Sequence, residues 1–184
     1  MKKNYKLLII CIVIPLAIGS FSGFLTRDSM NTFHTLNQPA LSPPGILFPI
    51  VWTILYILMG ISSYLVITSS QGKNKIKDAL ITYGLQLVFN FFWSIWFFNF
   101  GWYLFSFIWL LILWVLIFNT IALFYEISKT AAYLLIPYLL WVTFAGYLNF
   151  AIYLMNWIKH QKAATLMWQP FLYVPLFSSL KKFS

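Results

Sequence analysis

The chain alternates between long apolar runs and short polar connections. The apolar runs cover residues 7–25, 46–68, 79–98, 102–125 and 131–155. A helix rises about 1.5 Å per residue, so each run is long enough to cross a hydrocarbon core roughly 30 Å thick. Helices also satisfy their own backbone hydrogen bonds in lipid. The pattern therefore predicts an all-α integral membrane protein with a bundle of five transmembrane helices.

The connection at residues 26–45 is much longer than the usual loop of about five residues. It ends on Ser42, which can cap the next helix, with Pro43 and Pro44 in the first turn, where their missing N–H groups need no partner. Long loops at the mouth of a bundle often carry function. We interpret this loop as a lid.

The two ends of the chain leave alternatives open. Residues 1–156 are predicted to form a single membrane domain, and residues 157–184 a tail. Pro170 and Pro175 break the apolar stretch of the tail, so three placements fit it: in the interface, re-entrant, or disordered. A sixth spanning helix is less favoured.

The first apolar run follows three lysines and contains small residues, which is also typical of a signal peptide. We favour a retained helix, because the run is long for a signal peptide and the rest of the chain is itself membrane-embedded. Gly19 and Gly23 form a GxxxG pair that permits close approach of another helix. That approach can occur within the bundle or between two protomers, and packing within the bundle is favoured.

Three of the predicted helices carry aromatic and amide side chains at helical spacing. The members of these stripes are Trp52 and Tyr56 in the second helix, Gln86, Asn90, Trp93 and Phe97 in the third, and Trp141, Ala145 and Asn149 in the fifth. Amides are costly to expose to lipid, so these stripes face the interior. Hydrogen bonding between helices and contact with a ligand both explain them. A cavity enclosed by these aromatic and amide stripes would suit a flat apolar ligand with a few polar edges.

The charged residues predict how the chain is oriented in the membrane and argue against several classes of function. The chain is 61% hydrophobic and only 8% charged, with a net charge of +9. The basic residues lie at segment ends, where they meet head groups, so nucleic-acid binding is disfavoured. With the N-terminus inside, seven basic residues are cytoplasmic and five are external. This bias predicts a cytoplasmic N-terminus.

Conventional catalytic chemistry has few groups to work with. All three acids and both histidines fall outside the apolar runs, and the single Cys11 can make no internal disulfide. No metal-ligand spacing, phosphate-binding loop or dinucleotide fingerprint occurs. Acid–base catalysis and proton-coupled transport are therefore disfavoured, and no metal or required cofactor is expected.

Four groups of residues together resemble a known family. They are Pro39, Ser42, Pro43 and Pro44 before the second helix, VWTILYILMG at 51–60, Gln86, Leu87, Asn90 and Trp93 with Phe97 and Phe98, and LLIPYLLWVTFAGYLNF at 134–150. In this order and spacing the chain resembles the translocator protein family (TspO/MBR), also called tryptophan-rich sensory protein or peripheral-type benzodiazepine receptor. The likeness runs from about Pro15 to Asn156.

The resemblance implies a five-helix bundle, commonly dimeric, that binds porphyrins such as protoporphyrin IX in a cavity closed by the first long loop. By position, Trp52 and Trp141 match pocket indoles that act in light-dependent porphyrin degradation by bacterial relatives, so they are catalytic only if that reaction occurs here. Asn90 matches the pocket amide and Ala145 a small pocket residue. The expected ligand-binding set is Pro43, Pro44, Trp52, Tyr56, Gln86, Asn90, Trp93, Phe97, Trp141, Ala145 and Asn149.

Two positions depart from the family pattern. Leu41 stands where many relatives have a Trp, which removes one aromatic from the lid. The sterol motif of animal relatives needs a Tyr and an Arg where this chain has Phe150 and Leu154, so sterol binding is not expected. We therefore expect a porphyrin-binding receptor or sensor, with porphyrin photo-oxidation, ligand transport and a purely structural assembly role as alternatives. The composition, rich in Lys, Asn and Ile, favours a bacterial plasma membrane.

Overall fold

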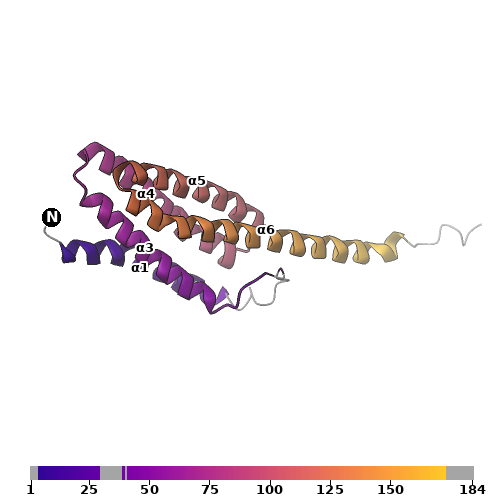
Figure 1. The fold of residues 1–184 in the computed structure, drawn as a ribbon. Helices are drawn as coiled ribbons and strands as arrows, with labels where there is room; N and C mark the ends of the chain where they lie inside the picture. The colour runs from indigo at the N-terminus through magenta and orange to yellow at the C-terminus, as the bar shows by residue number, and fades with distance from the viewer. Residues whose placement is uncertain (1–3, 30–38, 40, 173–184) are drawn as a thin grey trace, which may run out of the picture.

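The computed structural model describes residues 4–29, 39 and 41–172, and only the backbone of residues 157–172. The elements are α1 (Tyr5–Thr26), α3 (Leu47–Ile67), α4 (Lys73–Ser94), the π-helix η1 (Ile95–Asn99), α5 (Tyr103–Ile127) and α6 (Lys129–Leu172) (Figure 1). Five helical spans in this part of the chain are long and apolar enough to cross a membrane. The predicted all-α, five-span fold is confirmed.

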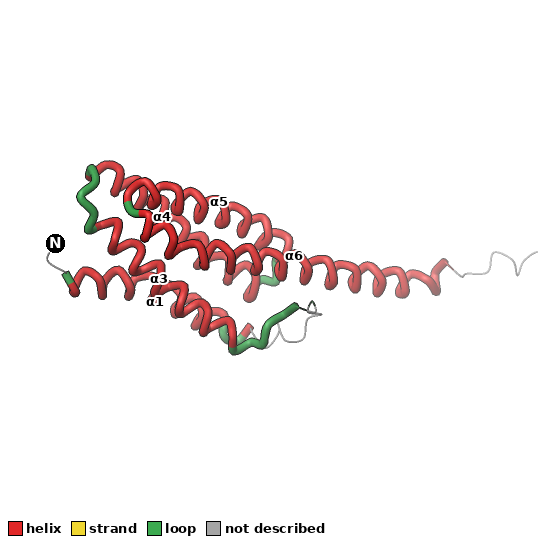
Figure 2. The backbone as a smooth tube through the Cα atoms, viewed as in Figure 1, coloured by secondary structure: helices red, strands yellow, loops and turns green. Residues whose placement is uncertain are grey.

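The helices run up and down through one bundle, joined by short loops apart from the connection after α1 (Figure 2). α1 packs on α3, α3 on α6, α6 on α5, and α5 on α4, while α1 also contacts α4 and η1. The beginning of α1 and the α3–α4 loop therefore share one end of the bundle. The end of α1, the beginning of α3 and η1 share the other end, where the predicted binding residues of α3 and α4 gather.

Close helix approach in the bundle depends on two glycines. A Cβ on Gly60 of α3 would meet the Cα atom of Ile12 on α1 and would lie 2.7 Å from the carbonyl oxygen of Cys11. A Cβ on Gly19 of α1 would meet the ring of Tyr56. Small residues let membrane helices touch backbone to backbone. Gly19 of the predicted GxxxG pair thus packs within the bundle, whereas a Cβ on Gly23 would meet no atom within 4 Å.

Three features of the helices differ from the prediction by more than a shift of one or two residues at an end. α4 begins at Lys73 rather than Ala79, because the lysine-rich segment is itself helical and Lys75 pairs with Glu126 on α5 at 3.0 Å. Lysine is a good helix former, so its charge marks the membrane boundary and not the end of the helix. α6 continues to Leu172, beyond the predicted domain boundary at 156 (Figure 1).

The third difference is the π-helix η1, which continues the backbone of α4. Its wider turn closes with bonds from Phe100 N to Ile95 O and from Trp102 N to Trp96 O, at 3.3 and 3.2 Å. Gly101, with φ of +64°, then reverses the chain into α5. Such π turns occur often at functional sites. Here the π turn lies beside the end of α1, at the end of the bundle where α3 begins.

Candidate ligand-binding cavity

A cavity of about 440 Å³ lies between α1, α3 and the α4–η1 helix. Its lining comes from α1 (Leu16, Gly19, Ser20, Ser22, Gly23 and Thr26), from α3 (Phe48, Pro49, Trp52, Thr53 and Tyr56), from α4 and η1 (Asn90, Trp93, Ser94 and Phe98), and from the two ends of the lid loop (Arg27 and Gly45). This volume falls in the range of small-molecule sites, roughly 300–1,000 Å³. A second hollow, of about 490 Å³ near the α3–α4 loop, is lined only by aliphatic side chains and lysines.

The aromatic wall of the cavity is built by neighbouring turns of two helices. On α3 the rings of Trp52 and Tyr56 stack with centroids 5.5 Å apart, as expected for residues four apart on a helix. On α4 and η1 the rings of Trp93 and Phe97 stack at 5.6 Å. Trp52 also meets the edge of Tyr138 from α6 at 6.1 Å. The wall therefore offers indole faces whose positions are fixed from behind.

The polar floor of the cavity is a chain of buried hydrogen bonds. The Tyr56 hydroxyl donates to Asn90 Oδ1 at 2.8 Å, and Asn90 Nδ2 donates to the Tyr138 hydroxyl at 3.2 Å. The Tyr138 hydroxyl in turn donates to Gln86 Oε1 at 2.9 Å. Three helices are thus tied together through one asparagine. This network fixes Asn90 at the cavity, while Gln86 lies behind it.

A second network holds Trp93 from the side away from the cavity. Its indole Nε1 donates to Asn149 Oδ1 at 3.2 Å, and Ser106 donates to the same oxygen at 3.1 Å. Asn149 Nδ2 donates to the carbonyl oxygen of Tyr103 at 2.7 Å. The sequence left two roles open for the amides, hydrogen bonding between helices and contact with a ligand. Asn149 forms hydrogen bonds between helices. It positions Trp93 from α6.

The predicted site residues divide into those that line the cavity and those behind it. Trp52, Tyr56, Asn90 and Trp93 line it, and Phe97 supports the indole of Trp93. Gln86, Trp141, Ala145 and Asn149 are not in the lining; Trp141 touches the lining residue Phe48 edge-on at 5.9 Å. The indole Nε1 of Trp141 is buried without a hydrogen-bond partner among the described residues. α6 is held in this outer layer because α3 stands between it and the cavity.

The lid loop is described only at its two ends. Residues 30–38 and 40, which form the middle of the predicted lid, lie outside the described residues. Arg27 and Gly45, where the loop leaves α1 and approaches α3, both line the cavity. Pro43 and Pro44 lie beside this edge without lining it, and Leu41 is exposed.

The contribution of α1 was not predicted from the sequence. Ser22 bonds to the hydroxyl of Ser94 and to the carbonyl oxygen of Phe91, which joins α1 to α4 at the cavity wall. Gly19, Ser22 and Thr26 lie at i, i+3 and i+7, which is one face of a helix. That row of small and polar residues in an apolar run is a signal that could have identified this wall.

The polar groups of the cavity suit binding rather than acid–base chemistry. The lining that the described residues provide has one cation, Arg27, and no carboxylate, histidine or cysteine. Within the described part of the chain no three His, Cys, Asp or Glu side chains come together to hold a metal ion. A site of indoles, amides and hydroxyls can stack on a flat ligand and orient its polar edge.

The model of the TspO/MBR family matches residues 11–155 of this chain, from α1 to the membrane part of α6. The chain belongs to this family. It is 39% identical to the tryptophan-rich protein TspO of Chlorobaculum tepidum, over 85% of this chain and 99% of that protein. It is 32% identical to the tryptophan-rich sensory protein of Cereibacter sphaeroides, over 72% and 81% of the two chains. The translocator protein of Homo sapiens is 33% identical over 76% of this chain and 85% of its own. The resemblance drawn from the motifs is confirmed.

Proposed function

We propose that this TspO/MBR protein is a membrane receptor that binds a porphyrin, or a similar flat aromatic ligand, in the cavity between α1, α3 and α4. The observation that carries the proposal is the pairing of an indole wall with a fixed amide. Trp52 and Trp93 line the cavity together with Asn90, whose side chain is held by its hydrogen bonds to Tyr56 and Tyr138. Ring faces bind a flat π-system, and one oriented amide selects its polar edge.

Quenching of tryptophan fluorescence by protoporphyrin IX tests the proposal. Binding to the purified protein should be saturable, and Trp52→Phe should raise the dissociation constant about two- to tenfold, the range expected when one aromatic contact of ~0.5–1.5 kcal/mol is weakened. Trp141→Phe should raise it less, because that indole is outside the lining and contacts the lining residue Phe48.

The matched control is Trp114→Phe. This indole donates to Thr143 at 2.8 Å and stacks on Phe118, and it does not line the cavity. The dissociation constant, not the amplitude of quenching, is compared, because each variant lacks one fluorophore. Equal dissociation constants for Trp52→Phe and Trp114→Phe would remove Trp52 from the site.

Light-dependent degradation of the bound porphyrin is a second candidate function, supported by the contiguous rings of Trp52, Tyr56 and Tyr138. An excited porphyrin can take an electron from an indole, and dioxygen is the oxidant that opening of the macrocycle would consume. Under light and air the porphyrin absorption bands should fade faster with the wild-type protein than with Trp52→Phe. Equal rates with the variant, or with an unrelated membrane protein, would rule this activity out.

We also propose that the N-terminus faces the cytoplasm of a bacterial plasma membrane. The beginning of α1, the α3–α4 loop and the α5–α6 connection share one end of the bundle (Figure 2). Lys6, Lys73, Lys75, Lys77 and Lys129 belong to these segments, and such clustering is typical of cytoplasmic ends. A reporter fused to the N-terminus of the full chain should be active inside the cell, and activity only outside would contradict the orientation.

A further inference from the structure

We infer that the ligand of this cavity has an acidic edge, and that Arg27 holds its carboxylate at the mouth of the cavity. The inference rests on the proposed function and deepens it, because it names the chemistry of the ligand and the residue that recognises it.

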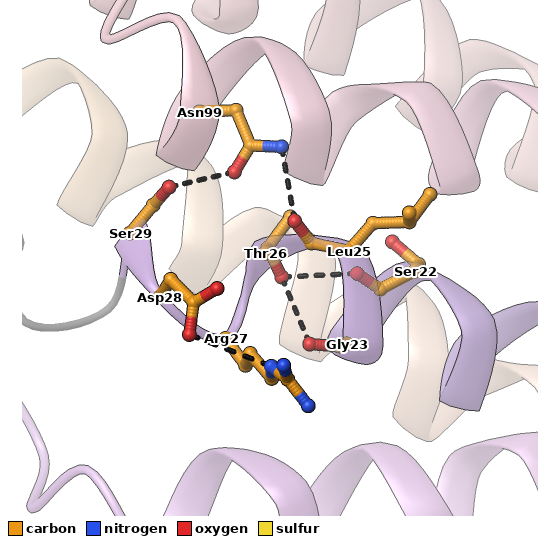
Figure 3. Close-up of polar contacts among 8 residues, drawn as sticks. All are labelled: Ser22, Gly23, Leu25, Thr26, Arg27, Asp28, Ser29 and Asn99. Carbon is orange, nitrogen blue, oxygen red and sulfur yellow. Dashed lines mark hydrogen bonds and ion pairs between the residues drawn. The ribbon is translucent and has the colours of Figure 1, made fainter.

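The charge of the cavity lining is unbalanced. Among the described residues Arg27 is its one cation, and the other polar lining residues are neutral serines, threonines, aromatic residues and an asparagine. A carboxylate would complement this charge, whereas a cationic ligand would meet repulsion that, in the described part of the chain, only the exposed Asp28 outside the lining could offset. The side chain of Arg27 points away from Asn99 and η1 (Figure 3).

The present partner of Arg27 is weak and replaceable. Its Nε lies 3.4 Å from Asp28 Oδ1, and the two side chains are 62% and 91% exposed. Such exposed pairs contribute little, so exchanging Asp28 for a ligand carboxylate has a low cost. The guanidinium also lies 4.6 Å from the ring centre of Phe24, which orients it. Its remaining N–H groups form the planar fork that grips a carboxylate with two bonds.

Hydrogen bonds to the last carbonyl groups of α1 also make the end of this helix compatible with an anion. The carbonyl groups of a helix C-terminus carry partial negative charge, which would oppose a ligand carboxylate. Thr26 Oγ1 donates to the carbonyl oxygens of Ser22 and Gly23 at 3.0 and 3.4 Å, and Asn99 Nδ2 donates to that of Leu25 at 3.1 Å (Figure 3). These donors reduce the negative potential around Arg27.

The same contacts fix the position from which Arg27 extends. Asn99, the last residue of η1, donates to α1 and also accepts a bond from Ser29 Oγ at 2.8 Å (Figure 3). The final turn of α1 is thereby tied to the π-helix on both sides of Arg27. A ligand stacked on Trp52 would then place its acidic edge at the loop end of the cavity, with its opposite edge toward the polar groups of Tyr56 and Asn90.

A pair of probes isolates this contact. Protoporphyrin IX carries two carboxylates, and its dimethyl ester has the same ring with neither charge. Each dissociation constant is corrected for the measured partitioning of that probe into detergent, and the ratio of the two constants, ester to acid, is compared between variants. The wild type should prefer the acid about three- to fivefold, as expected for a half-exposed ion pair. High salt should reduce this preference.

Three variants decide the outcome. Arg27→Gln should bring the ratio close to one, because it should weaken the binding of the acid and leave that of the ester unchanged. Asp28→Asn, which removes the competing carboxylate, should keep or raise the ratio. Lys75→Gln, the same change of charge at the opposite end of the bundle, should leave it at the wild-type value.

An unchanged ratio in Arg27→Gln, or an equal loss of affinity for both probes, would overturn the role of Arg27. Saturable binding of both probes by the wild type with a ratio of one would overturn the acidic edge but leave the porphyrin site in place. No saturable binding of either probe by the wild type would overturn the proposed function itself.

Discussion

Replacing Gly60 by Ala would test the contact between α1 and α3, which bounds the cavity. The new Cβ would meet the Cα atom of Ile12 and would lie 2.7 Å from the carbonyl oxygen of Cys11. Both are backbone atoms of a regular helix, so no side-chain rotation can relieve the overlap. Carbon atoms normally approach to about 3.5–4.0 Å, so α1 must move by about an ångström.

The expected cost of Gly60→Ala is a difference of two effects. Overpacking of a close contact costs about 1–3 kcal/mol, and Ala in place of Gly returns up to about 1 kcal/mol through helix propensity. We therefore expect the free energy of unfolding to fall by about 1–2 kcal/mol. Ligand affinity should fall as well, because the displaced α1 supplies one wall of the cavity.

The assay is unfolding of the purified protein in mixed micelles with increasing dodecyl sulfate, followed by circular dichroism. Gly84→Ala is the matched control, since a Cβ on Gly84 of α4 meets no atom within 4 Å. It should be neutral or slightly stabilising. Equal stability of the two variants would refute the account of the α1–α3 contact.

Three further changes probe the interior and the surface. Tyr138→Phe removes the hydroxyl that joins two buried amides, and should lower the free energy of unfolding by about 1–2 kcal/mol in the same assay; no measurable loss would contradict the network. Asn149→Leu leaves the indole N–H of Trp93 without its acceptor, and should destabilise by about 1–3 kcal/mol and blue-shift the tryptophan emission; a wild-type emission spectrum would argue against this bond. Lys75→Gln breaks an exposed pair with Glu126 and should stay within about 0.5 kcal/mol of wild type, so a larger loss in the unfolding assay would show an interaction beyond this pair.

Much of the fold followed from the sequence because lipid imposes a simple rule on each segment. Apolar runs of spanning length became the five spans, and the amides within them, such as Gln86 and Asn90, face the interior. The stripe of Trp52 and Tyr56 stacks as its spacing indicated. These features depend on local periodicity and on the cost of exposing polar groups, and both can be read from the sequence.

Other features depend on how the helices are placed against one another. Asn90 and Asn149 look alike in the sequence, yet one lines the cavity and the other supports Trp93 from behind. Trp141 on α6 is outside the cavity lining and contacts it only through the lining residue Phe48. Spacing gives the face of a helix, but not which neighbour that face meets.

The cavity wall contributed by α1 and the π turn of η1 were harder to foresee. The wall consists of small residues such as Gly19 and Gly23, which line a site by leaving space rather than by presenting a functional group. The π turn has no distinctive residue pattern, since its IWFFN sequence would also fit a regular helix. Its role becomes visible only through Asn99, which reaches the end of α1.

The most direct test of the account is an experimental structure of the protein with bound protoporphyrin IX. The account predicts that the porphyrin ring lies between α1, α3 and α4, stacked on Trp52, with one carboxylate within hydrogen-bonding distance of Arg27. A ring bound elsewhere, for example on the outer surface of the bundle, with this cavity empty would contradict it.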